Sequence, residues 1–482
     1  SEFKTKGIKL PVDSAYKSPH IKYMCTDAIT QLDIWIKMWH EQDTTIQALL
    51  LDYTSAGRFE EALAVAELAI AQPAGEQTLL HYYKSWCLIR LGKTAEAQIA
   101  IATAEKEPAD YCFPNALEAI EALQCVVDFA GKAPKALYYL GNLWYDKRRY
   151  PTAIAAWERS SREDETFPTV WRNLSLAYFN KMNRPDEAVA LLEKAFRLDH
   201  TDARVLMELD QLYKRLNRPH IERLCFLEQH IDIVMTRDDL YLEYVTLLNQ
   251  TGQYREAIRR IDQRKFHPWE GGEGKVPAQY QLARLELAKE LINRKKYDDA
   301  LALIDECYIY PTHLGEGKLP GAQENDFNYY KAYILQQQGR PEEAHSLFVK
   351  ASSGNSQPAA AMYYNDQKPD KIFYQGLAYR KLGEEEKARS RFNQLITYGE
   401  EHLFDRFKMD YFAVSLPDLL IWEDDMDKKN RIHCNYLMAL GHLGLGNRTK
   451  AEHFFDIERA DLGDGRTAAK RHGGDTGGEK QR

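Results

Sequence analysis

The chain has 482 residues, 44% of them hydrophobic and 28% charged, and its formal net charge at pH 7 is -8. The modest charge and the lack of any long Lys or Arg run in the sequence argue against a nucleic-acid groove. No stretch reaches the roughly 20 apolar residues of a membrane span, and no signal-peptide pattern opens the chain, so the sequence predicts a cytoplasmic protein.

Residues 1–26 show little helical periodicity and contain Pro11 and Pro19. The first three residues, Ser-Glu-Phe, stand where an initiating Met is expected, which is typical of a cloning remnant and leaves open whether a native targeting segment precedes them. We therefore expect a cloning remnant and an extended lead-in over residues 1–26, with a first helix near Asp27.

From there a pattern of two short helices recurs with a period of about 34 residues. In the most regular copy, residues 134–161, Leu140 and Gly141 lie on the first helix, and Ala153 and Trp157 lie on the second. Small residues let paired helices approach closely, and large apolar residues fill the space between them. The same register recurs at Ala62, Ala97, Ala257 with Ile261, Ala300 with Ile304, Ala344 with Phe348, Ala388 with Phe392, and Ala451 with Phe455.

Glycine marks many of the intervening turns, where the backbone turns left-handed. These turn glycines are Gly57, Gly92, Gly252, Gly339, Gly383 and Gly446. The pattern as a whole predicts an all-α fold, a tetratricopeptide-repeat (TPR) superhelix or α-solenoid of roughly ten units, in which each unit covers the apolar surface of its neighbours.

The regularity of the repeat divides the chain into segments. We expect N-terminal helical repeats over residues 27–133, central TPR units over 134–265, and TPR units with glycine-rich and aromatic loop insertions over 266–462. The polar, glycine-rich tail of residues 463–482 is expected to be disordered or derived from cloning.

Two of the insertions contain Gly-Glu-Gly-Lys followed by an apolar residue and Pro, at residues 272–277 and 315–320. Equivalent loops of successive repeats lie side by side on one edge of a solenoid, so we expect one shared surface, the loop edge. Its polar and aromatic side chains are His267, Trp269, Glu270, Glu273, Lys275, His313, Glu316, Lys318, Glu324, Asn325 and Asp326.

The loop edge has two interpretations. An exposed Trp among carboxylates and histidines would suit a sugar ring, which needs an apolar platform and polar partners for its hydroxyl groups. In the structural alternative, the glycines form tight turns, Glu pairs with Lys, and Trp269 fills a gap between units. A phosphate loop is not predicted, because an apolar residue follows each Lys where Ser or Thr is required, and no ligand spacing supports a metal at His267 and His313.

Two later segments also break the repeat. In the first, Tyr-Tyr-Asn-Asp over residues 363–366 precedes the helix that carries Phe373, and Asp366 is expected to cap or brace that helix or, alternatively, to join the loop edge. In the second, residues 410–425 hold an acidic run after Trp422, which favours a solvated face over a metal site.

The repeat register also predicts which side chains line the concave groove. They are Lys135, Tyr138, Asn142, Arg172, Asn173 and Arg204. Peptide-binding arrays use Asn side chains to grip a ligand backbone and basic residues to hold its carboxylate. Asn142 and Asn173 resemble the asparagines of the carboxylate-clamp TPR subgroup, but Tyr138 and Glu208 stand where that subgroup has basic residues. A chaperone-tail clamp is therefore disfavoured, and a groove for another peptide or for a neighbouring domain stays open.

Seven cysteines are scattered along the chain without a CxxC pair. This pattern favours reduced, mostly buried thiols over a disulfide framework or a zinc site. We expect neither a cofactor nor a metal.

Several strings are more specific than the general repeat signature, among them YYLGNLWYDKRRY, FHPWEGGEGKV, LGEGKLPGAQEND, YYNDQKPDKIFYQGLAY and DYFAVSLPDLL. Through them, residues 114–451 resemble the C-terminal part of a family of uncharacterised bacterial TPR proteins. The resemblance implies a missing upstream domain, β-rich and similar to carbohydrate-active enzymes, and a role linked to glycans.

The leading functional hypothesis is an interaction module or scaffold that holds a protein, a peptide or its own upstream domain. The alternative is that the loop edge contributes to a carbohydrate-binding or glycoside-processing site, although no spacing fixes a pair of catalytic carboxylates. The fragment alone is not expected to be an enzyme.

Overall fold

The computed structural model describes residues 44–71, 78–109, 112–269, 271–360, 366–406, 421–423 and 425–462. Within these ranges the regular structure is entirely helical, so the all-α prediction is confirmed. The helices fall into two units, residues 1–182 and 183–482. None of the described helices is both long enough and apolar enough to cross a membrane.

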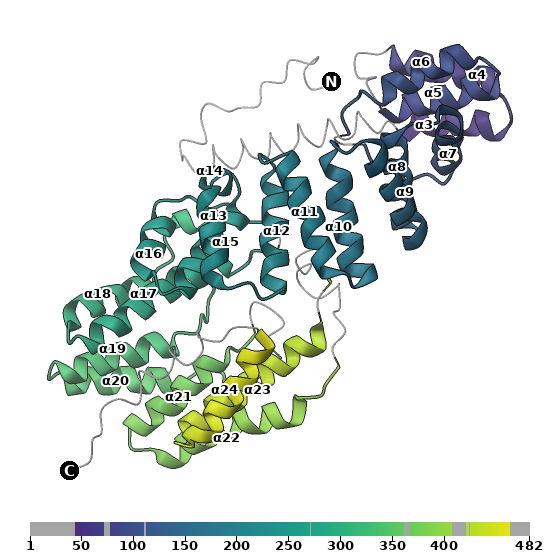
Figure 1. Ribbon diagram of the computed structural model, residues 1–482. Coiled ribbons are helices and arrows are strands. Elements are labelled where there is room, and N and C mark those ends of the chain that lie inside the picture. Colours follow the sequence, from purple (N-terminus) through teal and green to yellow (C-terminus); the bar gives the residue numbers. More distant parts are fainter. Residues whose placement is uncertain are drawn as a thin grey trace. The chain divides into compact units, whose positions relative to one another are not determined.

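The first unit is a stack of antiparallel helices (Figure 1). Its described helices are α3 (Thr44–Ser55), α4 (Phe59–Ile70), α5 (Thr78–Arg90), α6 (Thr94–Ala104), α7 (Glu118–Ala130), α8 (Pro134–Asp146), α9 (Tyr150–Glu163) and α10 (Pro168–Met182). Each of the pairs α3–α4, α5–α6 and α8–α9 packs together, and α5 also packs on α7. Contacts therefore run mainly between helices that are close in the sequence, as in a solenoid.

The second unit continues the same arrangement of pairs (Figure 1). Its described helices are α11 (Pro185–Leu198), α12 (Ala203–Arg215), α13 (His220–Gln229), the short α14 (Ile231–Val234), α15 (Asp238–Gln250), α16 (Tyr254–Asp262), α17 (Lys275–Asn293), α18 (Tyr297–Cys307), the 3-10 turn η1 (Thr312–Leu314), α19 (Asn325–Gln337), α20 (Pro341–Ser352), α21 (Pro369–Lys381), α22 (Glu385–His402), α23 (Met426–Gly444) and α24 (Arg448–Leu462). The first helix of one pair packs on the first helix of the next, as α15 does on α17, α19 on α21, and α21 on α23.

Each pair sets a small residue of one helix against a large apolar residue of the other. This small-to-large register explains how closely the paired helices approach. A Cβ atom added at Gly141 would lie 2.2 Å from Nε1 of Trp157, and one added at Gly376 would lie 2.4 Å from Cε1 of Phe392. The seven Ala residues that mark the other units are each at most 2% exposed, so the predicted register is confirmed. Close packing of this kind makes each pair sensitive to the addition of a single methyl group.

The turns inside the pairs are left-handed, as predicted. The six predicted turn glycines have φ between 73° and 80°. Four other pairs place a larger residue at the same left-handed turn: Arg148, Asn183, Asn217 and Lys295, with φ between 52° and 59°. These four turns carry no glycine to mark them in the sequence, and their residues adopt the left-handed backbone at some cost in energy.

The cysteines only partly match expectation. Cys87, Cys307 and Cys434 are buried, but Cys225 is exposed, and none of the described cysteines forms a disulfide. Cys225 lies on α13. The predicted lead-in at residues 1–26, the first helix near Asp27 and the tail at 463–482 lie outside the described residues.

Candidate functional site

The predicted groove residues of the first unit come together on α8 and α10. Nδ2 of Asn173 donates to Oδ1 of Asn142 at 3.0 Å, and Nη1 of Arg172 donates to Oδ1 of Asn173 at 3.1 Å. Nε1 of Trp157 also donates to Oδ1 of Asn142, at 3.2 Å. Successive first helices are thus linked by a row of polar side chains, the asparagine ladder of Asn142, Asn173 and Arg172.

The ladder fixes how the Asn142 amide is oriented. Its Oδ1 already accepts bonds from Trp157 and Asn173, and among the described residues its Nδ2 has no hydrogen-bond partner. Asn142 is half-buried, so this amide group is accessible. An amide held in this way can donate to the carbonyl of a peptide that lies in the groove.

The other predicted groove residues are more engaged in the fold. The Tyr138 ring is buried between Phe167 and Tyr139, with centroids 5.0 and 5.1 Å away. Lys135 Nζ donates to the carbonyl of Glu107. Arg204 lies on α12 of the second unit, where its Nε pairs with Glu208 at 2.9 Å.

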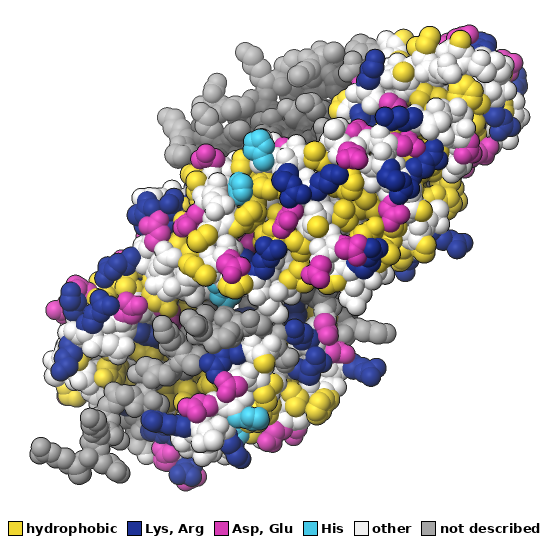
Figure 2. Space-filling view, viewed as in Figure 1, with side chains coloured by type: hydrophobic (Ala, Val, Ile, Leu, Met, Phe, Trp, Pro, Cys, Tyr) yellow, Lys and Arg dark blue, Asp and Glu magenta, His cyan; other side chains and the backbone are white. Residues whose placement is uncertain are grey.

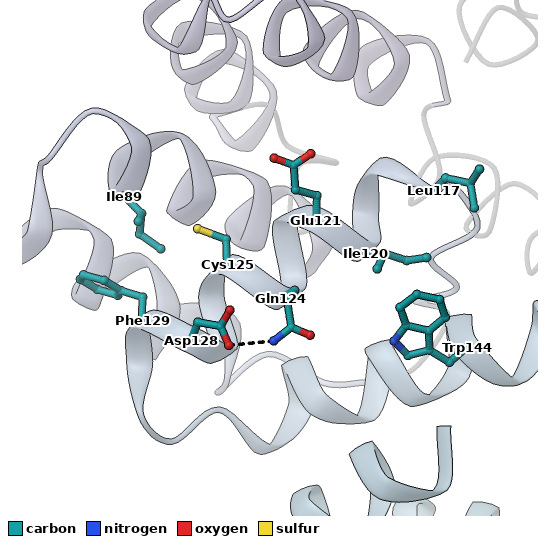
Figure 3. Close-up of a pocket in the computed structure, with 9 residues that line it drawn as sticks. All are labelled: Ile89, Leu117, Ile120, Glu121, Gln124, Cys125, Asp128, Phe129 and Trp144. Carbon is teal, nitrogen blue, oxygen red and sulfur yellow. Dashed lines mark hydrogen bonds between the residues drawn. The ribbon is translucent and has the colours of Figure 1, made fainter. Parts of the chain in front are cut away.

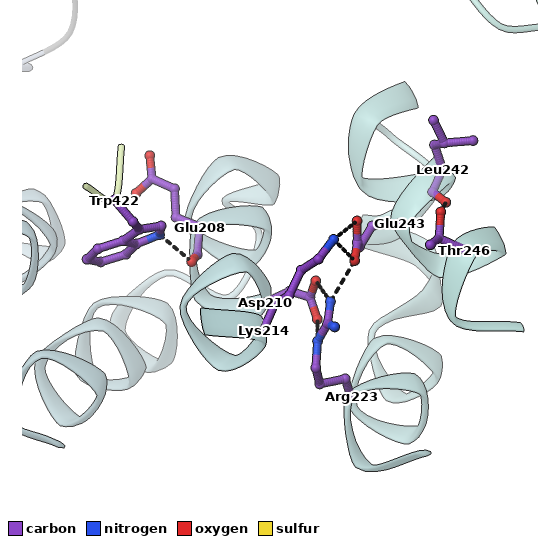
Figure 4. Close-up of polar contacts among 8 residues, drawn as sticks. All are labelled: Glu208, Asp210, Lys214, Arg223, Leu242, Glu243, Thr246 and Trp422. Atoms are coloured by element: carbon purple, nitrogen blue, oxygen red, sulfur yellow. Dashed lines mark hydrogen bonds and ion pairs between the residues drawn. The ribbon is translucent and has the colours of Figure 1, made fainter. Parts of the chain in front are cut away.

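A segment from far along the chain covers α12 in the second unit. Nε1 of Trp422 donates to the carbonyl of Glu208 at 3.0 Å, and Nη2 of Arg215 donates to the carbonyl of Trp422 at 3.1 Å (Figure 4). Trp422 is only 2% exposed. The sequence did not predict this contact, because it joins residues 214 positions apart and the repeat pattern encodes only neighbours.

The opposite side of α12 holds a buried charge cluster, formed by Asp210, Lys214, Arg223 and Glu243 (Figure 4). Arg223 from α13 donates to Asp210 at 2.6 Å and to Glu243 of α15 at 2.7 Å, and its side chain is 1% exposed. Lys214 donates to Glu243 at 3.0 Å. The cluster therefore links the three helices α12, α13 and α15.

The two carboxylates of the cluster differ in pKa. Burial raises the pKa of Asp210 to about 6, although the Arg223 charge works against this shift. Burial also acts to raise the pKa of Glu243, but the nearby charges of Lys214 and Arg223 outweigh it and lower that pKa to about 2. Neither group lies in an open cleft suited to catalysis, so we assign the cluster to the fold.

At the loop edge, the two Gly-Glu-Gly-Lys loops contact each other directly. The backbone N–H of Phe266 donates to the carbonyl of His313 at 2.8 Å, and the N–H of Gly274 donates to Oε2 of Glu316 at 2.7 Å. A Cβ atom added at Gly315, where φ is 77°, would lie 2.7 Å from the carbonyl oxygen of Phe266. The loops are thus joined through their backbones.

Both histidines of the loop edge lie near carboxylates from the helices, but only His267 is within hydrogen-bond distance of its carboxylate. His267 Nδ1 lies 2.8 Å from Oδ2 of Asp238, which also accepts from the His267 backbone N–H at 2.8 Å. His313 Nε2 lies 3.8 Å from Asp262, and burial lowers the pKa of its imidazole. In the described part of the chain, no group of three or more His, Cys, Asp or Glu side chains is placed to hold a metal ion.

The second loop is largely engaged in the fold. Lys318 donates to the Glu324 carboxylate and to the carbonyl of Tyr308. Asn325 and Asp326 are buried at the start of α19, where Nδ2 of Asn325 donates to Ala351 and Ser353, and Asp326 pairs with Lys371. Asn325 thus binds the end of the partner helix α20, and Asp326 binds α21 of the next repeat.

The first loop retains more accessible side chains. Trp269 is half-buried, and its ring lies so close to Gly272 that a Cβ atom there would be 2.3 Å from Cε2. Lys275 is exposed at the start of α17, and Glu273 is half-buried. Glu270 lies outside the described residues.

The two later breaks differ from expectation in detail. The N-cap of α21 is Lys368 and no side-chain hydrogen bond caps the helix, so Asp366 does not cap it, whereas the expectation that Asp366 braces the helix start or joins the loop edge stays a prediction. Tyr363, Tyr364 and Asn365 lie outside the described residues, as does most of the acidic segment. Asp425, at the end of that segment, caps α23 by accepting from the Lys428 N–H at 2.8 Å.

The first unit also contains an open groove that the sequence did not predict (Figure 3). Its volume is about 730 Å³, and it lies between α5, α7 and α8. The lining residues are Ile89, Leu117, Ile120, Glu121, Gln124, Cys125, Asp128, Phe129 and Trp144. Apolar and polar side chains share the lining, and Nε2 of Gln124 donates to Oδ1 of Asp128 at 2.8 Å within it (Figure 3).

Charge is finely mixed on the surface that Figure 2 shows, where Lys and Arg side chains alternate with Asp and Glu. Much of this mixing comes from short-range pairs along one helix, such as Arg340 with Glu343 at 2.6 Å. The opposite charges within each pair cancel at a distance. The face shown therefore has no extended area of one charge sign.

With this geometry in view, comparison with known proteins identifies the repeat. Residues 372–398, on α21 and α22, match the family model for the tetratricopeptide repeat. The chain is a TPR protein. The matched residues include Gly376 and Phe392. The close approach of α21 and α22 in this TPR protein therefore lies inside the segment that the family model recognises.

Three solved structures show how remote its similarities are. The crystal structure of MamA is 15% identical, covers 42% of this chain and 95% of that chain, and has a TM-score of 0.22. The C-terminal part of a TPR protein from Cytophaga hutchinsonii is 16% identical, with coverages of 63% and 93% and a TM-score of 0.25. A TPR protein from Parabacteroides merdae is 13% identical, with coverages of 70% and 98% and a TM-score of 0.19. At these values the likeness carries no argument about function.

Proposed function

We propose that this TPR protein is an interaction scaffold that holds an extended segment of a protein partner against the first helices of its pairs. The asparagine ladder carries the proposal, because its Asn142 amide is oriented by two internal donors and remains accessible. Solenoids present concave surfaces of this kind to their partners. An extended peptide needs side-chain donors and acceptors along its backbone, and the ladder supplies them.

Arg172 sets the charge of the expected partner. Its Nη1 donates to Asn173, so the guanidinium is held beside the ladder. An Arg in this position can add a charge-assisted bond to a carboxylate of the bound segment. We therefore infer a partner segment with an acidic side chain or a terminal carboxylate near the carbonyl that Asn142 binds.

The proposal can be tested by selecting peptides from a random library displayed on phage against the full chain. The selected peptides should bind the double variant Asn142→Ala, Asn173→Ala at least about tenfold more weakly, since each lost hydrogen bond is worth about 1 kcal/mol. The matched control is Asn115→Ala, an exposed Asn of the first unit outside the ladder, which should bind as the parent does. Selected peptides that bind the double variant equally well would contradict the proposal.

The finer hypotheses stay predictions. A carbohydrate at the loop edge would meet Trp269, Glu273 and Lys275, which are half-buried or exposed on the first loop. A bacterial role linked to glycans, an upstream domain as the partner, and a cytoplasmic location rest on the sequence alone.

A further inference from the structure

Trp422 packs on the surface of α12 in the way that a residue of a bound peptide would. Its side chain is 2% exposed, its Nε1 donates to the carbonyl of Glu208, and its own carbonyl accepts from Arg215. The contact therefore combines a buried aromatic side chain with a bond to the main chain of the segment. This combination is how peptide grooves commonly hold an extended ligand.

The contact lies on the side of α12 that the repeat register predicts to face the groove. Arg204, Glu208 and Arg215 follow a spacing of four and seven residues, so they share one side of α12. Glu208 is also 208 − 173 = 35 residues after Asn173 of the asparagine ladder, which is one repeat along the chain. The charge cluster of Asp210 and Lys214 takes the other side of the helix.

The chemistry of the contact favours tryptophan. The Glu208 carbonyl lies within a helix and already accepts one helical bond, so only a directed donor can use its second lone pair. The indole N–H supplies this donor while its rings fill apolar space, and a Phe in its place would lack the donor.

The surroundings favour acidic residues after the tryptophan. The side chains of Arg204 and Arg237 are 59% and 40% exposed and pair with Glu208 and Asp239, while a third arginine, Arg215, binds the carbonyl of Trp422. Three cations thus stand against two carboxylates. In the chain itself, Glu423 and two aspartates follow Trp422. The built-in segment thus matches the charge of the surface that it covers.

We propose that the groove-facing side of α12 is a recognition site for an extended peptide that carries Trp followed by acidic residues. Residues 421–423 are its internal occupant, which a partner segment of the same chemistry displaces. This inference rests on the proposed function, because it names the chemistry of one partner segment, but it uses different residues from the asparagine ladder.

A labelled peptide of residues 417–428 tests the inference when it is added to the full chain. It should bind the variant Trp422→Ala at least about tenfold more tightly than it binds the parent, whose site is filled. A peptide with Ala in place of Trp should not bind. Arg215→Gln in the Trp422→Ala background should weaken binding about tenfold or more, because one charge-assisted hydrogen bond is lost.

Two controls keep the outcomes separate. The Asn142→Ala, Asn173→Ala changes, added to Trp422→Ala, should leave binding of this peptide unchanged, so that failure of the ladder and failure of the α12 site are distinguishable. If circular dichroism shows that Trp422→Ala is unfolded, Trp422→Phe replaces it and should bind the peptide more tightly than the parent does. Equal binding to a folded variant and to the parent, or none to either, overturns the inference.

Discussion

At the scale of single residues, Arg223 is a buried cation that joins three helices. Its guanidinium bonds to Asp210 and Glu243 while its side chain is 1% exposed. A charge at this depth is tolerated only when partners surround it. The cluster therefore stabilises the arrangement of α12, α13 and α15 as long as all its members are present.

We expect Arg223→Met to lower the free energy of unfolding by about 3–5 kcal/mol at neutral pH, because two buried carboxylates lose their shared cation. Urea unfolding followed by circular dichroism measures the loss. Arg197→Met is the matched control, since the Arg197 side chain is 67% exposed and its ion pair with Glu193 spans 3.9 Å. The control should stay within about 0.5 kcal/mol of the parent.

The loss in Arg223→Met should depend on pH in a defined direction. The Asp210 pKa, already raised to about 6, rises further without Arg223, so the variant loses stability as pH rises through 6 and recovers it as Asp210 takes up a proton. In the parent, the Glu243 pKa is lowered to about 2, which adds stability above pH 4.5. In the variant this pKa rises, so that added stability is smaller. The Glu243 effect is the same at pH 5 and pH 7.5, because both values lie above 4.5, so only the Asp210 effect makes the loss larger at pH 7.5 than at pH 5. A loss equal at both values would contradict the role of Asp210.

At the scale of elements, the two Gly-Glu-Gly-Lys loops behave as one structure. The bonds from Phe266 to His313 and from Gly274 to Glu316 join them, and Gly315 lets their backbones approach. In the second copy of the motif, the two glycines Gly315 and Gly317 have different surroundings. Gly317 has open space around its Cβ position, and its backbone is not left-handed.

This difference predicts unequal effects of the same substitution. Gly315→Ala should destabilise the chain by about 1–3 kcal/mol, because it combines a left-handed backbone with a backbone clash. Gly317→Ala should change stability by less than about 0.5 kcal/mol. Thermal unfolding of both variants makes the comparison, and equal effects would show that the loops are not held in contact at Gly315.

Some elements could be predicted from the sequence and others could not, for physical reasons. The buried Ala positions and left-handed turns follow local rules of helix packing, and these predictions are confirmed at residues such as Ala388 and Gly383. The burial of Asn325 and Asp326 was not predicted, because polar side chains at a loop end read as exposed unless their partners in later repeats are known. Arg223 was missed for the same reason.

At the scale of the whole molecule, stability is expected to be local. Within each unit the helices contact mainly their neighbours in the sequence, so the free energy is close to a sum over repeats and their interfaces. A change in one repeat should therefore loosen its neighbours and leave remote repeats unaffected. The asparagine ladder and the α12 site would then respond separately to mutation.

Hydrogen exchange tests this locality with Gly141→Ala. The added methyl group would clash with Trp157 and should cost about 1–3 kcal/mol by overpacking. Exchange should become faster in α7 to α10, whereas α17 to α24 should keep their protection. Faster exchange throughout both units would instead indicate one cooperative structure.

The contact between Trp422 and Glu208 also has a consequence in time. Because it joins residues 214 positions apart, α12 is made long before the segment that covers it. At a synthesis rate of about 5–20 residues per second, the interval is on the order of 10–40 s. During that interval the surface of α12 is open on the nascent chain, so a partner present at the ribosome meets no competitor there, whereas a later partner must displace Trp422.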